Sequence, residues 1–122
     1  MKRRTRSLAL ALALPLAAAF AADAAADSGD KEGDVGRIVG LRVNTPGSSE
    51  HASEHGAITI RTTKGKRETY AWGGSTCPGQ KLTAAEVELL AAALRGRTSV
   101  RPFFTDAKNG TQRCLVAFEL RT

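Results

Sequence analysis

The sequence has few aromatic residues, few cysteines and no apolar segment long enough for a membrane anchor. Six of its 122 residues are aromatic, and four of these are phenylalanine. The apolar run from Leu8 to Phe20 covers 13 residues, whereas a helix needs about 20 to cross a hydrocarbon core. The chain also lacks a Gly-x-Ser-x-Gly elbow, a Walker loop and a dinucleotide fingerprint. We therefore expect no stable membrane insertion, and no motif points to those enzyme classes.

The N-terminal segment is predicted to be a cleavable secretory signal peptide over residues 1–26. Four positive charges lie within Met1–Arg6 and precede the short apolar run, which is the order that a translocon recognises. Ala19-Phe20-Ala21 and Ala24-Ala25-Ala26 both offer a small-residue cleavage site. No cysteine lies near them to carry a lipid. The protein is therefore expected to be exported, either to the periplasm or into the medium.

The charge balance changes once this segment is removed. Residues 1–26 contain four of the 18 basic residues and one of the 12 acidic residues, so the formal charge falls from +6 to +3. The strongly basic whole-chain isoelectric point would otherwise suggest a nucleic-acid partner. After cleavage the surface is only modestly basic, and no nucleic-acid partner is expected.

The two cysteines, Cys77 and Cys114, are predicted to form a disulfide bond. An even count with one pairing is typical of a small exported domain. Free thiols and pairing between chains are the alternatives, and an oxidising compartment disfavours both. On the polymer model, closing this loop stabilises the fold by about 4 kcal/mol.

The remaining pattern predicts a flexible polar lead-in over residues 27–34 and a single domain over residues 35–122. Alternating and β-branched residues indicate strands, and Thr83 and Glu86 form a capping box ahead of a helix whose apolar face ends near Gly96. Gly96 is expected to take the left-handed conformation after the helix. The expected strands cover residues 35–43, 57–63, 67–72 and 98–105, with a last strand around 113–120.

Three details refine these strands. Lys64-Gly65-Lys66 and Asn109-Gly110 are predicted to be hairpin turns. Pro102 is expected at an edge or a bulge because proline has no backbone N–H. In the last strand the alternation predicts that Cys114, Val116, Phe118 and Leu120 face inward, with Arg113, Leu115, Ala117 and Glu119 facing outward.

The order of three strands, a helix and two strands predicts a mainly β domain: a five-stranded antiparallel OB-like Greek-key barrel or sheet. Within this order, Gly36-Arg37-Ile38-Val39-Gly40-Leu41, a cysteine-bearing turn before a helix and Val100-Arg101 resemble the receptor-binding B subunits of bacterial subtilase- and pertussis-like toxins. The resemblance covers residues 36–105. It implies an exported OB-fold module that binds sugars and assembles into homo-oligomeric rings. It carries over no sugar-contacting residue.

His51-Ala52-Ser53-Glu54-His55 matches the H-x-x-E-H pattern of zinc hydrolases. That chemistry needs a supported helix and a third protein ligand. The segment instead lies among turn residues, and Glu50 is too near in sequence to serve as the third ligand. We therefore expect a solvated loop, with His51 and His55 as weak metal candidates, and no cofactor.

Two groups of residues are candidates for ligand binding. Tyr70 and Trp72 share one face of a predicted strand and would form an aromatic platform, with core packing as the alternative. Arg61 and Arg67 belong to a basic cluster that would bind sulfated glycan, lipid phosphate or nucleic acid, with ordinary solubility as the alternative. That cluster also includes Lys64, Lys66, Arg95, Arg97 and Arg101.

The function expected from the sequence is that of an exported, non-enzymatic module that binds a glycan or a protein. A small periplasmic inhibitor or an envelope-structural protein is the alternative. A zinc-dependent hydrolase is the third and least favoured reading.

Overall fold

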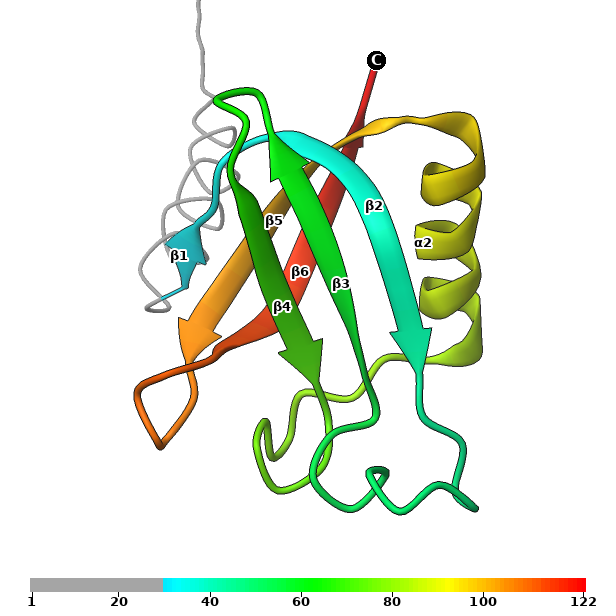
Figure 1. The fold of residues 1–122 in the computed structure, drawn as a ribbon, viewed down its shortest axis with the longest axis vertical. Helices are drawn as coiled ribbons and strands as arrows, with labels where there is room; N and C mark the ends of the chain where they lie inside the picture. The colour runs from blue at the N-terminus through cyan, green and yellow to red at the C-terminus, as the bar shows by residue number, and fades with distance from the viewer. Residues whose placement is uncertain (1–29) are drawn as a thin grey trace, which may run out of the picture.

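The computed structural model describes residues 30–122, which form a closed five-stranded β-barrel with one helix beside it (Figure 1). The predicted signal peptide lies outside the described residues. Around the barrel the strands follow the order β5-β2-β3-β4-β6, and β6 closes on β5. The elements are β1 (Lys31–Glu32), β2 (Gly36–Val43), β3 (Gly56–Thr62), β4 (Arg67–Trp72), α2 (Ala84–Gly96), β5 (Ser99–Asp106) and β6 (Arg113–Arg121).

The barrel closes through one parallel pairing, so the prediction of an all-antiparallel sheet is wrong at this point. β4 and β6 run parallel, with Tyr70 beside Arg113 and Ala71 beside Cys114. Neighbouring strands otherwise pair antiparallel. A chain that returns through a helix and a hairpin brings its last strand beside the third, and this gives the Greek-key order of an OB-like barrel. The predicted fold class is confirmed.

The predicted lead-in is wrong for its last residues, because β1 is paired with β5. Lys31 lies opposite Phe104 and Glu32 opposite Phe103. The buried Gly33 donates its backbone N–H to the carbonyl of Pro102 at 2.8 Å. Polar, glycine-containing composition predicts a flexible segment, but it does not reveal a sheet edge that the segment can join.

Two β-bulges alter which side chains face the core. In β2 the register shifts between Ile38 and Gly40. In β6 it shifts beside Val116, opposite Phe103 and Phe104 of β5, so the bulge lies near Pro102, which itself pairs with Phe118, and not at it. The extra residue shifts the alternation, so Leu115 is buried and the predicted outward set is wrong for Leu115. Beyond the bulge the predicted phase is kept, with Phe118 packed against the core and Leu120 opposite the buried Val100. Leu120 is still 41% exposed near the end of β6, so it does not join the core.

The helix α2 begins with the predicted capping box. The Thr83 hydroxyl accepts a hydrogen bond from the Glu86 amide at 3.2 Å, and the Glu86 carboxylate accepts one from the Thr83 amide at 2.8 Å. At the other end Arg97, not Gly96, takes the left-handed conformation, with φ 53°. The helix covers the side of β2 and buries Leu90 and Ala93 against the barrel (Figure 1).

The barrel interior holds one main core. Its buried members come from all five barrel strands and α2: Ile38, Ile58, Ile60, Tyr70, Trp72, Leu90, Ala93, Val100 and Leu115. A smaller cluster surrounds the disulfide between Cys77 and Cys114, whose Cα atoms are 5.5 Å apart. The predicted disulfide is thus present in the structure. It ties β6 to the segment that follows β4.

Within residues 30–122, no helix has the length and apolar character that a membrane crossing needs.

Candidate functional site

Tyr70 and Trp72 lie in the core, so they cannot form the surface platform considered from the sequence. Their exposed fractions are 1% and 2%. The Tyr70 hydroxyl donates a hydrogen bond to the Glu68 carboxylate at 3.0 Å. Burial raises the pKa of the Tyr70 phenol well above its ordinary value, and this hydrogen bond raises it further. The alternative of core packing holds for both residues.

A polar cleft of about 390 Å³ opens on the outside of the barrel, at the end where the β2–β3 and β5–β6 loops lie. Glu54 comes from the β2–β3 loop, and Thr69 and Ala71 come from the outer face of β4. The hairpin between β5 and β6 supplies the other wall, with Asp106, Gly110, Thr111, Gln112 and Arg113. In OB-fold barrels these two loops and this sheet face bind oligosaccharides and oligonucleotides.

Local hydrogen bonds hold the hairpin wall in place. The Ala107 amide donates to the Gln112 carbonyl at 2.8 Å, and the Thr111 amide donates to the Asn109 side-chain oxygen at 3.0 Å. Gly110 has φ +74°, which a glycine adopts without strain. The predicted Asn109-Gly110 turn is confirmed. Its role is to present Thr111 and Gln112 to the cleft.

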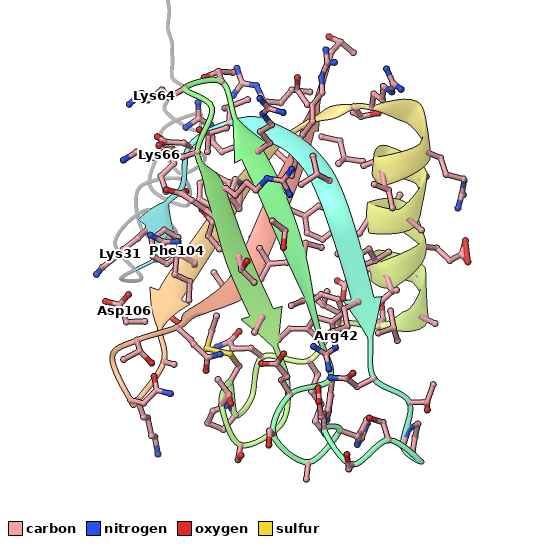
Figure 2. The ribbon with its side chains drawn as sticks, in the orientation of Figure 1. Lys31, Arg42, Lys64, Lys66, Phe104 and Asp106 are labelled. Atoms are coloured by element: carbon pink, nitrogen blue, oxygen red, sulfur yellow. A yellow bond between two sulfur atoms is a disulfide. The ribbon has the colours of Figure 1, made fainter. Side chains whose placement is uncertain are left out.

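Side chains from other elements contact the charged groups of the cleft. The Lys31 ammonium lies 2.6 Å from the Asp106 carboxylate, so β1 is linked to one residue of the cleft lining (Figure 2). The Arg113 guanidinium lies over the rings of Tyr70 and Phe104, 5.6 and 5.4 Å from their centroids. Cation–π contacts of this kind restrain a long side chain. The Arg113 guanidinium is therefore restrained, whereas the Asp106 carboxylate belongs to an ion pair whose two side chains are more than half exposed.

His51 and His55 lie in the β2–β3 loop, where residues 46–53 form turns and no helix. Their rings stack with centroids 4.3 Å apart. Partial burial and the nearby charges of His51 and Lys81 lower the pKa of His55 below 6.5. Within residues 30–122 no group of three or more histidine, cysteine or acidic side chains could hold a metal ion.

The basic candidates gather at the opposite end of the barrel. Arg61 lies at the end of β3 and directly faces Arg67 of β4, and both are exposed. Lys64 and Lys66 extend from the turn between these strands (Figure 2). Arg61 also lines a second cleft, of about 680 Å³, between β2 and the end of α2.

Sequence reasoning missed the polar cleft as a site. It named Glu54 only within the histidine pattern and Asn109-Gly110 only as a turn. The available signal was the element order, because an OB-like order places the first and last hairpin loops at one end of the barrel. Arg37, which lines the second cleft, was missed because its position opposite Arg61 depends on strand register.

Comparison of the chain with protein-family models, with curated protein sequences and with solved structures finds no significant match.

Proposed function

We propose that this protein is an exported, non-enzymatic binding module whose polar cleft takes a saccharide. The observation that carries the proposal is the cleft itself, at the two loops and the sheet face that OB-fold barrels use for oligosaccharides. The resemblance to sugar-binding toxin subunits points to the same class of ligand.

The chemistry of the cleft suits sugar hydroxyl groups. Each sugar hydroxyl can donate one hydrogen bond and accept others, so a site that binds several of them needs both donors and acceptors. Asp106 and Glu54 supply acceptors, and Arg113 supplies donors. Gln112, Thr69 and Thr111 can do either. The two carboxylates make the cleft a poor match for the phosphates of a nucleic acid.

The two carboxylates of the cleft are weakly held, whereas a general acid or base must be held within reach of a substrate atom. The Asp106 carboxylate is engaged by Lys31 and is about half exposed. Glu54 lies in a loop. A half-exposed, ion-paired carboxylate and a loop carboxylate are poorly held for this chemistry, so we place binding ahead of hydrolysis.

The saccharide proposal is tested on an oligosaccharide array with purified mature protein. Thr69→Val removes one hydroxyl from the outer face of β4 while keeping a β-branched side chain, and Gln112→Ala removes the hairpin amide. Each variant should weaken binding about tenfold, because each lost hydrogen bond leaves a sugar hydroxyl unpaired. Thr45→Val, at an exposed position outside the cleft, is the matched control and should bind like the unchanged protein.

Absence of binding across the array, or equal weakening by Thr45→Val, would count against the saccharide. Co-purification with one stable protein partner would instead favour the inhibitor or envelope-structural alternative. Export is tested separately by the intact mass of protein recovered from the periplasm and the medium. Cleavage after Ala21 or Ala26 is the expected result, and an uncleaved chain would contradict export.

A further inference from the structure

Three arginines form a row across three neighbouring strands at the end of the barrel opposite the polar cleft. Arg37 of β2 lies directly opposite Arg61 of β3, and Arg61 lies directly opposite Arg67 of β4. Side chains that are opposite each other in a sheet project from the same face. Like charges in this position repel and destabilise the sheet. The row therefore lowers the stability of the folded protein, and the fold alone does not explain why it is present.

The neighbouring positions on the same face show no such conflict. Two residues along each strand, Thr59 and Thr69 are paired, with their hydroxyl oxygens 3.2 Å apart in a hydrogen bond. A Thr–Thr pair is a favourable cross-strand combination. The same strands therefore place a favourable side-chain pair in one row and three like charges in the next row.

No carboxylate neutralises the row within the part of the chain that the structure describes. The ion pairs there use Lys31, Arg42, Arg101 and Arg121. All three arginines of the row are exposed. The segment from Arg61 to Arg67 also contains Lys64 and Lys66 and no acidic residue. The positive charge is therefore available to a ligand.

The second cleft extends this charge toward the helix. Its volume is about 680 Å³, and Arg37 and Arg61 line it together with Arg97, which follows the end of α2. Thr63 and Ser99 add hydroxyl groups to the lining. Guanidinium and hydroxyl groups donate hydrogen bonds to sulfate and phosphate esters. The planar guanidinium suits these esters because it can bind two of their oxygens at once.

We propose that the arginine row and this cleft bind an anionic saccharide chain through its sulfate or phosphate ester groups. Neighbouring strands are about 4.8 Å apart, so three arginines in a row span about 10 Å and fit repeated charges better than a single ion. None of the aromatic side chains in residues 30–122 is fully exposed to stack on bases, which disfavours a nucleic acid. The site differs from the polar cleft because its clustered arginines act through charge, although Arg67 of the row and Thr69 of the polar cleft share the outer face of β4.

The experiment measures binding of a heparin-derived hexasaccharide to the mature protein by titration calorimetry. Arg61→Gln should weaken binding about tenfold, and the combined Arg37→Gln, Arg61→Gln, Arg67→Gln variant about a hundredfold or more. Arg61→Lys keeps the charge and loses the planar fork, so it should fall between Arg61→Gln and the unchanged protein. Lys108→Gln, in the β5–β6 hairpin, removes one charge elsewhere and should change the affinity less than twofold.

Equal weakening by Lys108→Gln would overturn the proposal, because binding would then follow net charge alone. Tighter binding to phosphatidylglycerol vesicles or to single-stranded DNA than to the hexasaccharide would overturn the saccharide assignment.

Thermal unfolding without ligand separates a binding role of the arginine row from a structural one. Arg61→Gln should unfold at the same or a higher temperature because it relieves repulsion, and a clearly lower temperature would mean that the row is structural. Gln112→Ala, in the β5–β6 hairpin, should leave hexasaccharide binding unchanged, so failure of this site and failure of the polar cleft can be told apart.

Discussion

Gly56 is a position of close approach between backbone and side chains at the start of β3. A Cβ atom built there would lie 2.4 Å from a Trp72 ring carbon and 2.5 Å from the Arg42 carbonyl oxygen. Since neither backbone nor a buried ring can move freely, Gly56→Ala should lower the free energy of unfolding by about 1–3 kcal/mol. Gly47→Ala is the control, because nothing lies within 4 Å of its added methyl group. Urea unfolding that shows equal stability for both variants would contradict this packing.

The His51–His55 pair predicts a pH dependence of stability. The pKa of His55 is lowered in the folded state from its ordinary value of 6.5, so the unfolded chain takes up a proton first as the pH falls. The contribution of His55 is fully present above about pH 6.5 and is lost as the pH falls from there toward the lowered pKa. His51→Gln removes a neighbouring charge and should raise the pKa of His55, as measured by NMR titration. An unchanged pKa would show that burial and the charge of Lys81 cause the shift without His51.

For single residues, the sequence predicts local backbone conformation well, but it does not predict which distant residues will be in contact. The hairpin turns at Gly65 and Gly110 follow from turn chemistry, and both glycines have positive φ. Tyr70 and Trp72 could be assigned to a strand, but their burial depends on which face the barrel closes over. Arg97 takes the left-handed position expected at the adjacent Gly96, because helix ends are the least certain boundaries in a sequence-based prediction.

At the scale of the element, the capping box of α2 gives the most direct prediction. Thr83→Ala removes the hydroxyl that accepts the Glu86 amide and should lower the free energy of unfolding by about 1 kcal/mol. Thr83→Ser keeps a hydroxyl in the same place and should recover most of that loss. Urea midpoints of the two variants are compared with the unchanged protein. Similar midpoints for Thr83→Ala and Thr83→Ser would mean that the cap contributes little.

The side-chain alternation of the sequence predicts some strands correctly and fails for others. Alternation locates β3 and β4 almost to the residue, because no bulge interrupts their pairing. In β6 the bulge beside Val116 shifts the pattern, so Leu115 enters the core instead of Val116. β1 is only two residues long and pairs with a distant strand, which no local periodicity can reveal.

At the scale of the whole molecule, the disulfide should supply a large part of the stability. It closes a loop with a sequence separation of 37 residues. The polymer model then predicts that Cys77→Ala with Cys114→Ala lowers the free energy of unfolding by about 4 kcal/mol. Urea unfolding of this double variant is compared with that of the oxidised protein. A loss below about 1 kcal/mol would mean that strand pairing alone holds β6 against the segment after β4.

The two clefts lie at opposite ends of one barrel and differ in chemistry. The polar cleft combines carboxylates with hydroxyl, amide and guanidinium groups. The second cleft has three arginines and no carboxylate in its lining. The element order could have predicted the first from OB-fold geometry alone. The arginine row could be identified only from the strand register, which places residues that are distant in sequence directly opposite one another.

The most direct test of the central claim is an amide NMR titration of the mature domain with the neutral oligosaccharide that binds best on the array. With a saccharide site in the polar cleft, chemical-shift changes gather at Glu54, at Thr69–Ala71 and at residues 106–113, and Gln112→Ala weakens them. Shift changes confined to other surfaces, or no change at millimolar ligand, would contradict a saccharide site in the polar cleft.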